Sequence, residues 1–123
     1  MEARQMIEIS AHDGDDFAVM TRFGAWQIGM ISYSERFSRF AVLERHLLTD
    51  EAFVLLLGEA TLYTDRETVQ MEKGKVYNVP AGVWHHIVVS EDARVLVVEN
   101  SDTSKENSER TYFEEKENGH VDK

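Results

Sequence analysis

The sequence predicts an all-β domain, either a sandwich or a closed barrel, and three observations support this. Apolar runs of strand length recur along the chain and are separated by turn-forming residues. β-Branched and aromatic residues are frequent in these runs, as is typical of strands. No window keeps apolar residues at the sustained period of an amphipathic helix. We therefore expect a compact β domain with little helix over residues 15–100.

The expected strands follow one another from residue 26 to residue 99, and most of them are bounded by turn-forming or polar residues. Residues 64–67 and residues 90–92 are short polar connections of the kind that join the two strands of a hairpin. Gly58 follows one strand and Pro80 follows another. The expected strands are 26–33, 40–47, 52–57, 60–63, 68–71, 76–79, 84–89 and 94–99.

The two ends of the chain differ in composition from this central part. Residues 1–14 form an N-terminal segment, which runs into a polar loop at residues 10–16. Residues 101–123 are polar and charged, and their only sizeable apolar side chains are Tyr112, Phe113 and Val121. We expect this C-terminal tail to be frayed or loosely docked on the domain.

Length and composition narrow the class of protein. The 123 residues fit one domain, and 13 basic against 23 acidic residues give a net charge of −10. Such a charge disfavours nucleic acid and anionic membranes as partners. The absence of cysteine excludes disulfides, thiolate metal sites and cysteine nucleophiles. The chain shows neither a signal-peptide pattern nor an apolar run of membrane-spanning length, so we expect a soluble cytoplasmic protein.

Four polar side chains lie on strand faces that should be buried: Glu44, His46, Glu51 and His85. Glu44 and His46 are two residues apart and share one face of their strand. Each of the four, taken singly, is more often a hydrogen-bonded core residue than a functional one. If their faces point into a barrel, however, two imidazoles and two carboxylates converge there. They would suit Zn, Mn, Fe, Ni or Co, or would serve as general acids and bases without a metal.

The spacing of the first three candidates resembles a motif of the cupin superfamily. The first cupin motif has the form G-x5-H-x-H-x4-E-x6-G, and this chain has Glu44-x-His46-x4-Glu51-x6-Gly58. The chain departs from the motif at two positions, because Glu44 replaces its first histidine and Ser38 replaces its leading glycine.

The fourth candidate lies in a segment that resembles the second cupin motif, G-x5-P-x-G-x2-H-x3-N. Here the chain has Gly74-x5-Pro80-x-Gly82-x2-His85, and only the final asparagine is replaced, by Val89. Pro80 and Gly82 favour a bend that would aim His85 inward. The resemblance covers about residues 40–100.

The resemblance implies a double-stranded β-helix, or jelly-roll, barrel like that of small single-domain RmlC-like cupins. In metal-bound cupins, the residues at these motif positions hold the ion. It therefore implies Glu44, His46, Glu51 and His85 as metal ligands or catalytic residues. The substituted position leaves a metal-free site open, as in cupins that resemble sugar-nucleotide epimerases. The sequence has no glycine-rich nucleotide loop, so we expect no nucleotide cofactor.

A shorter resemblance indicates the type of ligand. Residues 82–86, Gly-Val-Trp-His-His, are similar to a segment of ureidoglycolate lyase, and residues 49–53 share its character. We expect a small polar metabolite, sugar-derived or a carboxylate, and lyase, isomerase or dioxygenase chemistry. The alternative is a non-catalytic cupin that binds or senses a ligand without metal. A third possibility is a barrel whose polar interior is vestigial.

The outward faces of the strands favour self-association. Residues 54–57 and 95–98 are apolar on both faces, so a second surface must cover the outer one. We therefore expect a homodimer. Trp84 should pack against the partner, and His86 should make a surface or interface hydrogen bond. The residues that share this outward parity are Val54, Leu56, Trp84, Val88, Leu96 and Val98.

Overall fold

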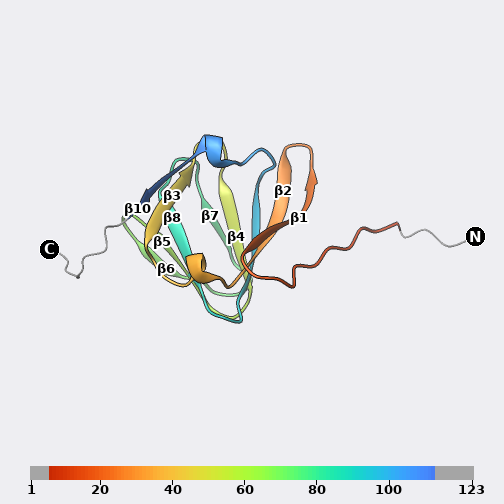
Figure 1. Cartoon of the computed structure of the whole chain (residues 1–123), viewed down its shortest axis with the longest axis horizontal. Helices are drawn as coiled ribbons and strands as arrows, with labels where there is room; N and C mark the ends of the chain where they lie inside the picture. The colour runs from red at the N-terminus through yellow and green to blue at the C-terminus, as the bar shows by residue number, and fades with distance from the viewer. Residues whose placement is uncertain (1–5, 113–123) are drawn as a thin grey trace, which may run out of the picture.

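The computed structural model describes residues 6–112, which form ten strands in two antiparallel sheets (Figure 1). The first sheet has the order β1-β2-β9-β4-β7. Its strands are β1 (Phe17–Phe23), β2 (Trp26–Ser32), β9 (Arg94–Asn100), β4 (Glu51–Leu57) and β7 (Val76–Val79). The second sheet has the order β10-β3-β8-β5-β6. Its strands are β10 (Ser108–Tyr112), β3 (Val42–His46), β8 (His85–Val89), β5 (Ala60–Thr64) and β6 (Thr68–Gln70).

The chain passes repeatedly from one sheet to the other, which makes the fold a jelly-roll barrel, as the sequence predicts. From β3 in the second sheet it crosses to β4 and returns for β5 and β6. It then crosses for β7, returns for β8 and crosses once more for β9. Two short 3-10 turns, η1 (Glu35–Phe37) and η2 (Lys105–Asn107), are the helical segments of the described residues. None of the helical segments in this part of the chain has the length and apolarity needed to cross a membrane.

The core lies between the inner faces of the two sheets. Val95 and Val97 of β9 are fully buried, and Phe53 of β4 is 2% exposed. Their neighbours Leu96 and Val98 are only half-buried. The alternation shows that odd-numbered residues of these strands face the interior. The same parity brings Glu51 of β4 into the barrel.

The expected strands between residues 26 and 99 match the observed ones to within a few residues at each end, but two further strands were not predicted. β1 pairs with β2, and β10 pairs with β3 over all five of its residues. The segment Ser108–Tyr112 is therefore part of the second sheet, not a loosely docked tail. Its sequence is polar because it forms a sheet edge and is held by backbone hydrogen bonds. Residues 113–123 lie outside the described residues.

The outward apolar residues divide between two faces and do not form the single patch that the sequence suggests. Val54, Leu96 and Val98 lie on the first sheet. Val88 lies on the second sheet, and Trp84 immediately precedes the same strand. Since the two inner faces enclose the core, the two outer faces point away from each other.

The turn between β4 and β5 requires glycine at position 58, and this generates a prediction for stability. Gly58 has a φ of +77°, and a Cβ atom there would lie 2.7 Å from Ala93 Cα, Asp92 Oδ1 and Ser90 Oγ. We expect Gly58→Ala to lose about 1 kcal/mol to left-handed strain and about 1–3 kcal/mol more to overpacking. Urea unfolding measures the loss.

Gly74 provides the matched control, because it has a φ of +84° but no atom within 4 Å of the added Cβ. Gly74→Ala should therefore show the strain alone. Equal losses of unfolding free energy in the two variants would contradict the prediction.

Candidate functional site

The four predicted site residues line one cavity of about 570 Å³ between the two sheets. Glu44 and His46 come from β3, Glu51 begins β4 and His85 begins β8. The cavity therefore takes side chains from both sheets. β3 and β8 pair at Glu44 and His85, and this places the two motif segments side by side.

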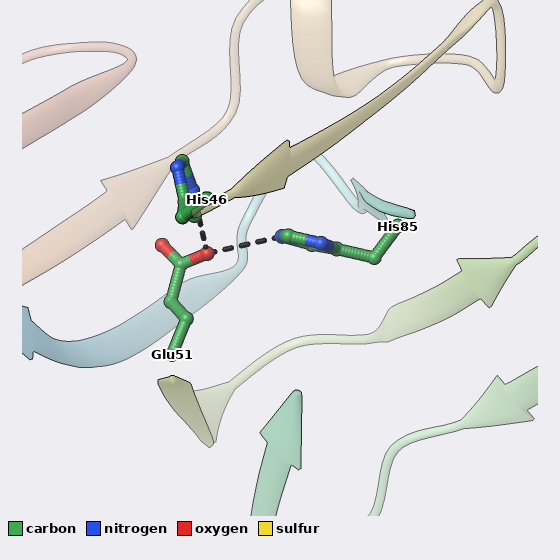
Figure 2. A group of neighbouring side chains, drawn as sticks. All are labelled: His46, Glu51 and His85. Atoms are coloured by element: carbon green, nitrogen blue, oxygen red, sulfur yellow. Dashed lines mark hydrogen bonds and ion pairs between the residues drawn. The ribbon is translucent and has the colours of Figure 1, made fainter. Parts of the chain in front are cut away.

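The side chains of His46 and His85 converge on one carboxylate oxygen of Glu51 (Figure 2). His46 Nε2 and His85 Nε2 each lie 3.0 Å from Glu51 Oε1. Glu51 and His85 are buried, and His46 is partly buried. One ligand atom from each residue lies within 4.8 Å of the others, so the group is of a size to hold a metal ion.

Both imidazoles are oriented by hydrogen bonds on their far nitrogen atoms. His85 Nδ1 lies 3.0 Å from the carbonyl oxygen of Val83, which can only accept, so this nitrogen carries a proton. His46 Nδ1 lies 2.8 Å from Ser108 Oγ, and that hydroxyl donates its own proton to the carbonyl of Ser104. His46 Nδ1 must therefore also donate. Each ring thus directs its Nε2 atom to Glu51.

The three groups stabilise one another as ions. Burial would raise the pKa of Glu51, but hydrogen bonds from His46 and His85 outweigh it and hold the pKa well below its ordinary range. Burial would likewise lower the pKa of each imidazole, but the hydrogen bond and charge of Glu51 raise both pKa values above the ordinary one. Without a metal, the cluster favours a carboxylate between protonated histidines.

Glu99 is a further member of the site that the sequence analysis did not identify. It is buried at the end of β9 and accepts a hydrogen bond of 2.7 Å from Gln27 Nε2. Burial, followed by the charge of Glu51 and a hydrogen bond to it, raises the pKa of Glu99 to about 7. A signal was present in the sequence, because Glu99 shares its strand face with Val95 and Val97.

Glu44 lines the cavity but does not join the three converging residues. Its Oε1 atom lies 3.1 Å from Nε of Arg110, which is its cross-strand partner on β10. The carboxylate at the first-histidine position of the motif is thus held by a strand that the sequence analysis assigned to the tail.

Trp84 and His86, which flank His85, have different surroundings. The guanidinium carbon of Arg45 lies 4.5 Å from the Trp84 ring centroid. His86 is buried instead of lying at the surface, and its ring stacks at 6.3 Å from both Phe37 and Phe40. β3 pairs with β8 only beside His85, so η1 and the residues after it cover His86. Burial lowers its pKa.

Residues 40–99 match the family model of the cupin domain. This region is a cupin domain. An uncharacterized protein of Streptomyces coelicolor is 48% identical over 52 residues, which cover 40% of this chain and 48% of that protein. The match thus spans about half the length of the curated relative.

Solved structures share the fold at low identity. A cupin-2 domain protein of Shewanella frigidimarina has a TM-score of 0.59 and 20% identity, over 75% of this chain and 84% of that chain. Pac13 of Streptomyces, a nucleoside dehydratase, has a TM-score of 0.65 and 10% identity, over 96% and 98% of the two chains. KdgF of a Halomonas species has a TM-score of 0.57 and 16% identity, over 68% and 76%.

The site in this cupin domain fits a divalent metal. Two imidazole nitrogens and a carboxylate oxygen are a donor set that suits Zn, Mn, Fe, Ni or Co. The bonds from both Nδ1 atoms leave the Nε2 atoms as the ligating positions. His46, Glu51 and His85 could hold the ion, and Glu44 remains paired with Arg110.

The charged cluster of His46, Glu51 and His85 should make the stability of the protein depend on pH. The lowered pKa of Glu51 adds stability above the ordinary carboxyl value of 4.5, and this is lost as pH falls. The raised pKa values of His46 and His85 add stability below 6.5, and this is lost as pH rises. Glu51→Gln should therefore cost most between pH 4.5 and 6.5, by about 3–5 kcal/mol.

Urea unfolding across this pH range, with a chelator present, measures the loss. Glu59→Gln is the control, because Glu59 is exposed on the turn after β4 and should show little change. A loss in Glu51→Gln that did not vary with pH would contradict the ionic description of the cluster.

Proposed function

We propose that this cupin binds a small polar metabolite in its barrel cavity and acts on it with His46, Glu51 and His85. The observation that carries the proposal is the convergence of both imidazoles on one carboxylate oxygen inside the cavity. The cavity volume of about 570 Å³ suits a small molecule. Buried ionisable groups with displaced pKa values are typical of catalytic sites.

The chain's own residues suit proton transfer. The His46 side chain is 11% exposed and that of His85 is 4% exposed, so His46 is the imidazole that a ligand reaches first. Glu51 stabilises the protonated form of either ring. Glu99, with a pKa of about 7, is divided between its neutral and ionised forms near neutral pH. His46 then gives a proton to the bound metabolite or takes one from it.

A divalent metal held by His46, Glu51 and His85 would act as a Lewis acid and polarise a carbonyl or hydroxyl oxygen of the metabolite. Glu99 and Gln27 adjoin these three residues and would lie outside the set of ligands.

Lyase chemistry is the reaction class that we propose. Among the solved structures of this fold, Pac13 is a nucleoside dehydratase, and a variant of it was solved with uridine. Dehydration needs a base to remove one proton and an acid to protonate the departing hydroxyl. A protonated histidine can supply the acid, and the ionised fraction of Glu99, whose pKa is about 7, can supply the base.

The metal is tested by single substitutions in the full chain. His46→Ala and His85→Ala should each lower bound divalent metal about tenfold or more after reconstitution at neutral pH, because each removes one ligand. Acid should release the ion as the imidazoles protonate. Elemental analysis by mass spectrometry measures the content, and His12→Ala, which lies outside the cluster, is the control.

Wild-type protein that gained no metal on reconstitution would remove the metal from the proposal and leave proton transfer alone. Turnover of hydroxylated small molecules by wild type, and its loss in His46→Ala, then tests catalysis. A metabolite that bound with micromolar affinity but was never converted would favour the non-catalytic alternative.

We also propose that two copies pair through the outer face of the first sheet. The segment before β1 extends away from the barrel (Figure 1), and its Met6, Ile7 and Ile9 are 88%, 73% and 78% exposed. Met6 of this segment borders a groove that also includes Met30 and Leu96. A second copy would cover both the segment and the groove.

Light scattering should give about twice the chain mass of 14.2 kDa. Leu96→Lys should shift this mass toward one chain, because it places a charge at the centre of the proposed interface. Val88→Lys makes the same change on the opposite sheet and is the control. A wild-type mass of one chain that persisted at rising concentration would refute the pairing.

A further inference from the structure

Arginine is concentrated around the cavity although the chain is strongly acidic. The net charge is −10, and the chain has eight arginines and five lysines. Arg22 of β1, Arg36 of η1 and Arg110 of β10 all line the cavity, and no lysine does so among the described residues. Arginine is the cation that matches carboxylate and phosphate groups with paired hydrogen bonds.

Two of these guanidinium groups already have acidic partners. Arg36 Nε lies 2.9 Å from Asp16 Oδ1, and Arg110 Nε lies 3.1 Å from Glu44 Oε1. The Arg22 side chain, in contrast, makes neither an ion pair nor a hydrogen bond in the described part of the chain. Among the three arginines that line this cavity, Arg22 is therefore the one without an acidic partner in the described residues.

The position of Arg22 connects it to the catalytic cluster. In the ladder between β1 and β2, Arg22 lies directly opposite Gln27. Gln27 donates to Glu99, whose pKa is raised by burial and by the neighbouring charge of Glu51. Arg22 and the His–Glu cluster thus face the same cavity, separated by the Gln27–Glu99 pair.

Hydroxyl groups between β9 and β10 complete this part of the cavity. Ser101 Oγ donates to the carbonyl of Gly24, and Thr103 Oγ1 donates to the carbonyl of Asn100. Because both protons are used within the protein, these oxygens offer lone pairs to the cavity. They suit a ligand that carries hydroxyl donors of its own.

We propose that Arg22 binds the anionic group of the metabolite, and that the metabolite is a hydroxylated carboxylate or phosphate. The anion would accept hydrogen bonds from the Arg22 guanidinium, and hydroxyls along the ligand would donate to Ser101 and Thr103. The other end of the ligand would then reach His46. This assignment rests on the proposed function, since it names the substrate class of the same cavity.

The positive charge of Arg22 affects how an anionic ligand binds in the cavity. The ionised form of Glu99 in this cavity repels a negatively charged ligand, whereas Glu44 is paired with Arg110 and Glu51 with two histidines. An unpaired guanidinium at the cavity offsets that repulsion and fixes which end of the ligand lies away from the cluster. A neutral sugar of the same size would keep the hydroxyl contacts but gain no charge-assisted bond to Arg22.

The test uses D-gluconate and D-glucose 6-phosphate as anionic probes and D-glucose as the neutral probe. Titrations use the full chain after removal of divalent metals, so that no probe binds through an ion. Calorimetry gives the affinity, and the nuclear magnetic resonance signal of the Arg22 Nε–H group reports the contact. We expect a saturable shift with at least one anionic probe and none with glucose, and comparing gluconate with glucose 6-phosphate separates carboxylate from phosphate.

Arg22→Ala should weaken binding of the anion about tenfold or more, which corresponds to loss of a charge-assisted hydrogen bond. Arg22→Lys should weaken it less, because it keeps the charge but loses the planar fork. Arg66→Ala is the control, since Arg66 is exposed on the turn between β5 and β6.

Equal binding of glucose and the anions, no saturable binding of either anion, or unchanged affinity in Arg22→Ala would overturn the proposal. Metal uptake by Arg22→Ala should equal that of wild type, because Arg22 is not one of the converging residues. Failure of this proposal is therefore distinguishable from failure of the metal centre.

Discussion

One buried carboxylate, Glu51, is the constraint on which the site depends. An isolated charge in an apolar interior is strongly unfavourable, and Glu51 remains ionised because two imidazoles bond to the same oxygen. Those imidazoles are in turn fixed by Val83 and Ser108. The cluster also joins the two sheets, because Glu51 belongs to the first and both histidines belong to the second.

Much of the barrel follows from the period of two along each strand. Alternation in residues 52–57 and 94–99 predicts which side chains of β4 and β9 are buried, and the buried positions confirm it. The sequence does not predict β10. An edge strand is held by backbone pairing, so its sequence shows no apolar alternation. The sequence also does not predict the burial of His86, because this burial depends on where η1 packs.

Register explains why the sequence indicates part of the site and misses the rest. The cupin-like spacing indicates His46, Glu51 and His85, and the structure brings these three residues together. Glu99 has no comparable spacing signal. Its role arises because β9 lies between β2 and β4, which sets Glu99 opposite Gln27 and next to Glu51. Strand order and register are properties of the folded sheet, and a single sequence does not display them.

β10 determines how this chain departs from the cupin motif. Its Ser108 orients His46, and its Arg110 pairs with Glu44, the residue at the position of the motif's first histidine. A glutamate there could have joined the converging ligands, but the cross-strand arginine neutralises it and holds it aside. A substitution in the motif and a basic residue on the last strand therefore act together. They leave a compact group of three residues, His46, Glu51 and His85.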